Sequence, residues 1–202
     1  LLLAIGCVMI VNNALANGTG IGFRLQPITD PGPDAAVRFG NFVLSLASSG
    51  SILAGGSFNS FNGVPRPNLI RLGGDGSVDF SFNPVSGPDG AVFALKVQTD
   101  ERILVGGAFQ NYDALSRRGI VRLATNGLPD RTFDPITGVD GLVRSIGVQT
   151  NGLIIVGGSF NSFAGVGRTN LTRLYADGSV DTSFLDPFYN AVQPGPNGPV
   201  YS

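Results

Sequence analysis

The chain has 202 residues, of which 43% are hydrophobic, so it is long enough to bury a core of its own. Only 13% of the residues are charged and the formal net charge is -1, which argues against nucleic acid as a partner. There is no His and only one Cys, which excludes a disulfide within the chain and a Cys/His zinc site, and removes the commonest general acid–base residue.

The N-terminal segment has the pattern of a secretory signal. Leu1 to Val11 is an apolar run too short to span a bilayer, and the A-x-A motif Ala14-Leu15-Ala16 follows it. We predict that residues 1–16 are a signal peptide, already truncated at its start and cleaved after Ala16. A membrane anchor and a lipoprotein acylated at Cys7 are the alternatives, but the apolar run continues past Cys7, which argues against acylation there. Residues 17–39 are expected to form a linker or a lone strand.

A 51-residue repeat organises the rest of the chain. The motif [IL]-[IL]-[AV]-Gly-Gly-[SA]-Phe occurs at residues 52–58, 103–109 and 154–160, and Gly55, Gly106 and Gly157 are 51 residues apart. A fixed period of this length indicates stacked supersecondary units. We therefore divide residues 40–202 into repeats at 40–90, 91–141 and 142–197, with a further repeat beginning at 198.

The second repeat shows the expected elements best. Apolar, β-branched segments predict strands at 92–97, 102–105 and 119–123, separated by a turn at 99–101 and a polar loop at 110–118. Asn126-Gly127 predicts a hairpin turn, followed by a short polar fourth strand at 128–133. In the first repeat, residues 42–46 occupy the place of the first strand. The sequence thus predicts an all-β fold of four-stranded units.

Further positions match at the same spacing, which supports the division into repeats. They include Arg66, Arg117 and Arg168; Arg71, Arg122 and Arg173; Asp75, Asn126 and Asp177, each followed by Gly; Asp79, Asp130 and Asp181; and Phe82, Phe133 and Phe184. The third repeat loses register after Phe184, and residues 198–202 resemble the first strand of a fourth repeat that is cut off.

The motifs I-L-V-G-G-x-F, R-x-x-I-x-R-L and D-G-x-L-D-x-x-F resemble those of the delta-60 repeat family of bacterial secreted and surface proteins. The resemblance covers residues 40 to about 187 and implies a β-propeller and a secreted, periplasmic or cell-surface location in a bacterium. It implies no activity, so no functional residue is carried over. The kelch and WD-type repeats match less well, because this chain lacks the Trp residues on which both depend.

A propeller explains why the strands are apolar on both faces, since neighbouring blades cover both sides of each sheet. Paired glycines inside a strand indicate a bulge or a close approach of backbones, and we expect them where adjacent blades converge. Three blades cannot close a ring, because propellers have about four to eight. We therefore expect further blades of a longer chain, or else pairing of repeats between molecules.

Three sets of matched residues are candidates for chemistry, and each has a simpler structural explanation. The Asp75/Asp79 and Asp177/Asp181 pairs are candidate calcium ligands, but Asx turns and contacts to backbone amides or Arg also account for them. The two Arg rows are candidates for binding an anionic glycan, but one Arg–Asp pair per blade explains them as well. The aromatic set is a candidate ligand platform, although repeated aromatics more often form the core between blades. Its members are Phe58, Phe61, Phe82, Phe109, Tyr112, Phe133, Phe160, Phe163 and Phe184.

No catalytic, cofactor-binding or metal-binding residue is predicted, and no cofactor. The leading hypothesis is a non-enzymatic binding or scaffold module whose partner is an unidentified protein or glycan. The alternative is a propeller enzyme acting on polysaccharide, with Asp residues around the central channel. An enzyme would break the repeat at a few channel-facing positions, because a single active site is asymmetric.

Overall fold

The computed structural model describes residues 6–11, 23–28, 38–39, 42–184 and 196–201, and it describes side chains from Val43 onward. Within these ranges the chain forms only strands, turns and bends. The same ranges contain no helix with the length and hydropathy needed to cross a membrane. The fold is therefore all-β, as the sequence predicted.

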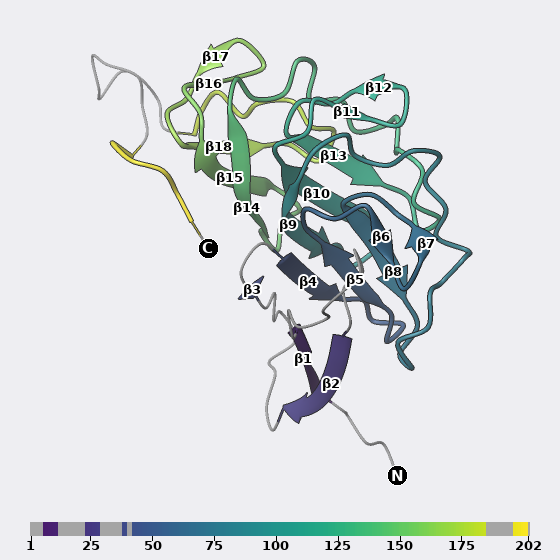
Figure 1. The fold of residues 1–202 in the computed structure, drawn as a ribbon. Helices are drawn as coiled ribbons and strands as arrows, with labels where there is room; N and C mark the ends of the chain where they lie inside the picture. The colour runs from purple at the N-terminus through teal and green to yellow at the C-terminus, as the bar shows by residue number, and fades with distance from the viewer. Residues whose placement is uncertain (1–5, 12–22, 29–37, 40–41, 185–195, 202) are drawn as a thin grey trace.

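Three open antiparallel sheets, one for each repeat, follow one another along the chain (Figure 1). The first sheet has the order β3 (Arg38–Phe39), β4 (Phe42–Leu46), β5 (Ile52–Gly55) and β8 (Leu69–Leu72). The second has β9 (Val92–Val97), β10 (Ile103–Gly107) and β13 (Ile120–Leu123). The third has β14 (Leu142–Val148), β15 (Ile154–Ser159) and β18 (Leu171–Leu174).

Each repeat also has a small hairpin of two-residue strands. These hairpins pair β6 (Ser60–Phe61) with β7 (Val64–Pro65), β11 (Asn111–Tyr112) with β12 (Leu115–Ser116), and β16 (Ser162–Phe163) with β17 (Val166–Gly167). At the N-terminus β1 (Gly6–Val11) pairs with β2 (Phe23–Ile28), so cleavage after Ala16 would remove the partner of β2.

The predicted strands are largely confirmed, with two differences. The segment predicted as a loop at 110–118 contains the β11–β12 hairpin. The predicted fourth strand is reduced to a single bridge in each repeat, between Leu123 and Pro129 in the second. The physical reason is common to the three repeats, since Val78 and Val180 stand where the second repeat has Pro129. The carboxylates of Asp79, Asp130 and Asp181 accept the backbone N–H two residues on, at 2.9, 2.9 and 3.0 Å, and this turns the chain away from the sheet.

Burial of both sheet faces explains the continuous apolar strands. All residues of β10 and β13 are buried. Ile103 and Val105 pack against Leu53 and Leu69 of the first sheet, whereas Leu104 faces the third sheet. Successive strand residues point to opposite faces, so a strand between two sheets must be apolar at every position. This packing is what the propeller hypothesis predicted.

The aromatic set is mainly core, which confirms the structural explanation. Phe82, Phe109 and Tyr112 are buried in the cluster between the first and second sheets, and Phe133, Phe160 and Phe163 in that between the second and third. Phe61 is buried in the cluster of the first sheet, while Phe58 and Phe184 are half-buried. The described aromatic side chains of this set thus stabilise the sheets, and most are unavailable to a ligand.

The paired glycines lie where neighbouring sheets approach each other, as predicted. A Cβ on Gly106 would be 2.6 Å from Val143 Cγ1 of the third sheet, and a Cβ on Gly55 would be 2.5 Å from Val92 Cγ1 of the second. The register of β10 against β9 shifts between Gly106 and Gly107, which marks a bulge. Gly157 has the same relation to Val200, at 2.7 Å.

Candidate functional site

The repeated Asp residues are occupied by internal contacts. Asp75, Asn126 and Asp177 each accept the backbone N–H two residues on, which is the geometry of an Asx turn. Asp79, Asp130 and Asp181 do the same and also accept a hydroxyl from Ser81, Thr132 or Ser183. In the described residues no three acidic, His or Cys side chains gather as a metal site would require. The Asx-turn explanation of these pairs is confirmed.

One Arg row joins neighbouring sheets. Arg71, Arg122 and Arg173 donate through Nε to Asp79, Asp130 and Asp181 at 2.7, 2.8 and 2.7 Å. Arg122 Nη1 also donates to the Ala176 carbonyl of the third repeat at 2.5 Å, and Arg71 Nη1 to the Thr125 carbonyl of the second. Each guanidinium lies over a Phe ring of its own repeat, 4.6–5.0 Å from the centroid. The predicted Arg–Asp pair per blade is confirmed.

These contacts hold the carboxylates ionised. Hydrogen bonds from Ser183 and Arg173 lower the pKa of Asp181 to about 2. The pKa of Asp79 is lowered chiefly by the Ser81 hydroxyl, and that of Asp130 by Thr132 and Arg122 against the opposing effect of burial. A general acid at neutral pH needs the opposite shift, because it must hold its proton.

The second Arg row also makes contacts within its own repeat. Arg66 Nη2 donates to Asn83 Oδ1 at 3.2 Å, Arg117 Nη1 lies 3.5 Å from Asp134 Oδ1, and Arg168 Nη2 donates to the Thr182 carbonyl at 3.2 Å. Arg168 is only 3% exposed. The row is therefore not an open cationic surface for a glycan.

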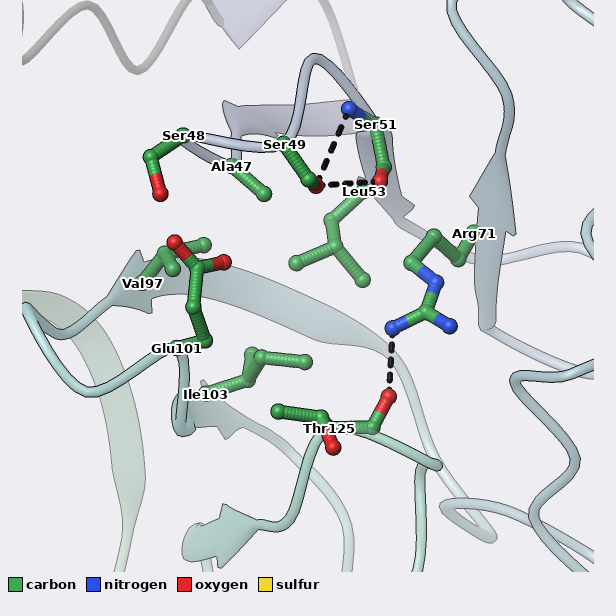
Figure 2. A pocket seen from close by; sticks show the side chains of 10 residues that line it. All are labelled: Ala47, Ser48, Ser49, Ser51, Leu53, Arg71, Val97, Glu101, Ile103 and Thr125. Carbon is green, nitrogen blue, oxygen red and sulfur yellow. Dashed lines mark hydrogen bonds between the residues drawn. The ribbon is translucent and has the colours of Figure 1, made fainter.

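A pocket of about 500 Å³ opens between the first and second sheets, at the end where the strand-connecting turns lie (Figure 2). In this view Glu101 and Arg71 stand on opposite sides, and the Ser residues of the first turn line an edge between them. The volume is within the range of about 300–1,000 Å³ found for ligand pockets. The lining residues are Ala47, Ser48, Ser49, Ser51, Leu53, Arg71, Val97, Glu101, Ile103 and Thr125.

The pocket exists because the first turn departs from the other repeats. Residues 47–51 are Ala-Ser-Ser-Gly-Ser, where the second repeat has Gln-Thr-Asp-Glu-Arg and the third has Gln-Thr-Asn-Gly-Leu. At the position of Ser51 the second repeat carries Arg102, whose Nη1 extends to within 3.4 Å of Asp130 Oδ2. Small side chains thus leave a space in the first repeat that a long one would fill.

Glu101 is the second departure from the repeat. Gly50 and Gly152, at the matching positions, have φ of +81° and +83°, and Glu101 adopts φ of +64° in the same turn. A side chain in this left-handed region costs about 1 kcal/mol or more. Glu101 is half-buried as a residue, and its carboxylate forms no ion pair with any described residue. The turn therefore carries a strained, uncompensated negative charge at the pocket.

The positive charge in the pocket is compensated. Arg71 is paired with Asp79 at 2.7 Å and also bonds Ser81 Oγ at 3.0 Å and the Thr125 carbonyl. The net charge facing the pocket is that of Glu101. The hydroxyls of Ser48, Ser49, Ser51 and Thr125 add donors and acceptors above an apolar floor of Leu53 and Ile103. The site can hold a small polar molecule that carries a positive group.

The sequence analysis did not identify this pocket. A signal was available, because Glu101 is the only Glu of the chain and stands where both other repeats have Gly. The replacement of Gly by Glu at this position points to a function only once the structure is known. The structure shows that the turn has positive φ and that it lines the pocket beside residues 47–51.

Comparison with protein families finds one match. The model described as "Domain of unknown function (DUF5122) beta-propeller" matches residues 47–82, 98–133 and 149–184. Each matched stretch begins in the turn after the first strand of a repeat and ends at Phe82, Phe133 or Phe184. Searches of curated proteins and of solved structures found no match.

Proposed function

The chain belongs to the DUF5122 beta-propeller family, and from this membership we propose that it is a non-enzymatic binding or scaffold module of an exported bacterial protein. The narrower assignment to delta-60 repeats is part of the proposal and is supported by the three I-L-V-G-G-x-F-like motifs. So is the arrangement of 51-residue blades at 40–90, 91–141 and 142–197. Val200 packs against Gly157 as Val143 packs against Gly106, which supports a fourth repeat beginning at 198.

The observation that carries the proposal is the use of the repeated polar residues. The Asp and Arg residues that recur at 51-residue spacing are bonded within and between the sheets, and the resolved pKa shifts of the Asp residues are downward. Asp and Arg side chains bonded in this way stabilise the sheets, and they are not available to transfer protons to a substrate.

The enzyme alternative needs an Asp that breaks the repeat. Asp100 and Asp134 do so, and each lies 3.5 Å from an Arg. Asp113 is a further candidate. Asn62 and Ala164 stand at the matching positions. Asp113 Oδ1 accepts the N–H groups of Ser86 and Gly87 at 2.8 Å each, so this carboxylate fixes the connection between the first and second sheets. Its contacts support a structural role.

The test is an assay of binding and turnover in the same preparation of the full chain. The immobilised protein is incubated with soluble polysaccharides and with extracts of bacterial envelope. The material that it retains and the reducing ends that it releases are both measured. We expect retention of a polymer or protein with reducing ends at the level of buffer. Release of reducing ends that is lost in Asp113→Asn would establish the enzyme instead.

Export is tested separately, by the N-terminal sequence of the protein recovered from the periplasm or the medium of an expressing bacterium. We expect it to begin at Asn17. A chain retained in the cytoplasm with an intact N-terminus would refute export.

A further inference from the structure

We propose that the pocket between the first and second sheets binds a primary ammonium group, carried on a small polar molecule, against the carboxylate of Glu101. The inference rests on the proposed binding role and names the chemistry that one site of the module recognises. The ammonium group has two possible sources, an amino sugar and a lysine side chain, and the experiment below separates them.

Charge is the first reason. Of the two charged residues that line the pocket, Arg71 is already paired with Asp79 at 2.7 Å, whereas Glu101 has no ion-pair partner among the described residues. The carboxylate of a half-buried residue is more stable with a cationic partner, because charge-assisted hydrogen bonds are stronger than neutral ones. A bound ammonium would supply that partner.

The second reason is the backbone of the turn. Glu101 occupies a position that takes Gly in the other two repeats, and it holds φ of +64°. Residues in such strained conformations persist where the surroundings or a function require them. The fold does not require Glu here, since Gly50 and Gly152 make the same turn. Binding accounts for a residue that stability alone would replace.

The third reason is the shape and the remaining polarity of the pocket, which select an organic cation over a metal ion. Ca²⁺ takes about six to eight oxygen ligands, often several of them from carboxylates, and Mg²⁺ takes about six, usually one or two carboxylates completed by waters and phosphate oxygens. Glu101 is the only carboxylate that lines this pocket. A space of about 500 Å³ instead suits a molecule the size of a sugar ring or an extended side chain. The Ser hydroxyls, of which those of Ser49 and Ser51 bond each other at 2.7 Å, line the same space.

The matching place between the second and third sheets shows why the site is specific to one pair of repeats. There Arg102 replaces Ser51, lies within 3.5 Å of both Asp100 and Asp130, and so places a cation of the protein itself in the corresponding space. The third-repeat turn presents Gly152 instead of a carboxylate. The pocket of the first two sheets therefore has a carboxylate with no ion-pair partner among the described residues, whereas the matching place in the next pair has an Arg paired with two Asp residues.

The experiment titrates the full chain with matched probes and follows binding by NMR and calorimetry. The probes are glucosamine against glucose, and Nα-acetyl-lysine amide against Nα-acetyl-norleucine amide, so that only the first member of each pair carries an ammonium group. We expect Kd values in the millimolar range for the members with an ammonium group, because a single charged contact and a few hydroxyls supply most of the affinity. Preference for glucosamine identifies an amino sugar as the ligand class, and preference for the lysine derivative identifies a lysine side chain.

Three variants test the residue assignment. Glu101→Gln keeps the size of the side chain, and we expect its affinity for the charged probes to fall about tenfold or more. Glu101→Gly restores the residue of the other repeats, so binding should be lost while the melting temperature is unchanged or higher. Ser51→Arg reproduces the second repeat and should block the pocket by placing a guanidinium beside Glu101.

Equal affinity for the charged and uncharged probes would overturn the proposal, and so would the absence of binding by both ammonium compounds. Unchanged affinity in Glu101→Gln and Glu101→Gly would overturn it as well. These outcomes are distinct from failure of the proposed function. If the wild type and Glu101→Gln retain the envelope partner equally, the protein still has a binding role, but at another surface. If the protein turns over polysaccharide, the proposed non-enzymatic function is wrong.

Discussion

The substitution Arg122→Ala tests whether the repeated Arg is structural. In the folded protein the Arg122 side chain is 5% exposed and donates to Asp130 Oδ2 at 2.8 Å, to Thr132 Oγ1 at 3.0 Å and to the Ala176 carbonyl at 2.5 Å. It also lies 5.0 Å from the centroid of the Phe133 ring. Alanine removes all of these contacts at once.

Removing one partner of a buried ion pair costs about 3–5 kcal/mol, because the other charge is left without compensation. Asp130 would retain the Thr132 N–H at 2.9 Å and the Arg102 guanidinium at 3.4 Å. We therefore expect the lower end of that range, about 3 kcal/mol, which corresponds to a fall in melting temperature of about 6–12 °C for a chain of this size.

The assay is thermal and urea unfolding followed by circular dichroism, with two comparisons. Arg122→Lys should show an intermediate loss, because an ammonium group cannot reproduce the planar fork of the guanidinium. It also provides a measurement if Arg122→Ala does not fold. Arg118→Ala is the matched control, since Arg118 is exposed and bonds Gln110 Oε1, so its effect should stay within about 0.5 kcal/mol. If Arg122→Ala has the same melting temperature as Arg118→Ala, the structural explanation of the row Arg71, Arg122 and Arg173 is wrong.

Three further predictions concern the packing of the sheets and its response to acid. Gly106→Ala should destabilise by about 1–3 kcal/mol in urea unfolding, because its Cβ would lie 2.6 Å from Val143 Cγ1, and an unchanged midpoint would contradict this packing. Tyr112→Phe should cost about 1 kcal/mol, since the buried hydroxyl donates to the Gly127 carbonyl at 2.9 Å, whereas a neutral effect would mean that this bond adds nothing. The pKa of Asp181 is lowered to about 2 from the ordinary value near 3.9, so its contribution is fully present above about pH 4 and is lost as the pH falls through 2. Melting temperatures should therefore drop between pH 5 and pH 2, and Asp181→Asn should flatten that drop; an equal drop in both proteins would refute the assignment.

Much of the fold could be predicted because its signals are local. Apolar segments such as 92–97 and Asp-Gly or Asn-Gly turns lie within single repeats, and agreement among three repeats separates them from chance. The predicted fourth strand was wrong in extent for a reason that is also local, because in each repeat an Asx turn directly after the bridge outweighs strand propensity. The hairpin of β11 and β12 was missed because two-residue strands leave almost no periodicity to detect.

The sequence by itself determined the period, the positions of the main strands in each repeat and which Arg, Asp and Phe residues match one another, since all of these depend on spacing along the chain. Only the tertiary structure decided which residues of different repeats meet. The contact of Arg122 with Ala176, and the pocket formed by residues 47–51 and Glu101, join atoms about one repeat apart. Such contacts depend on how one sheet packs against the next. A residue that differs from the repeat, as Glu101 does, can be interpreted chemically only when the pocket that it lines is known.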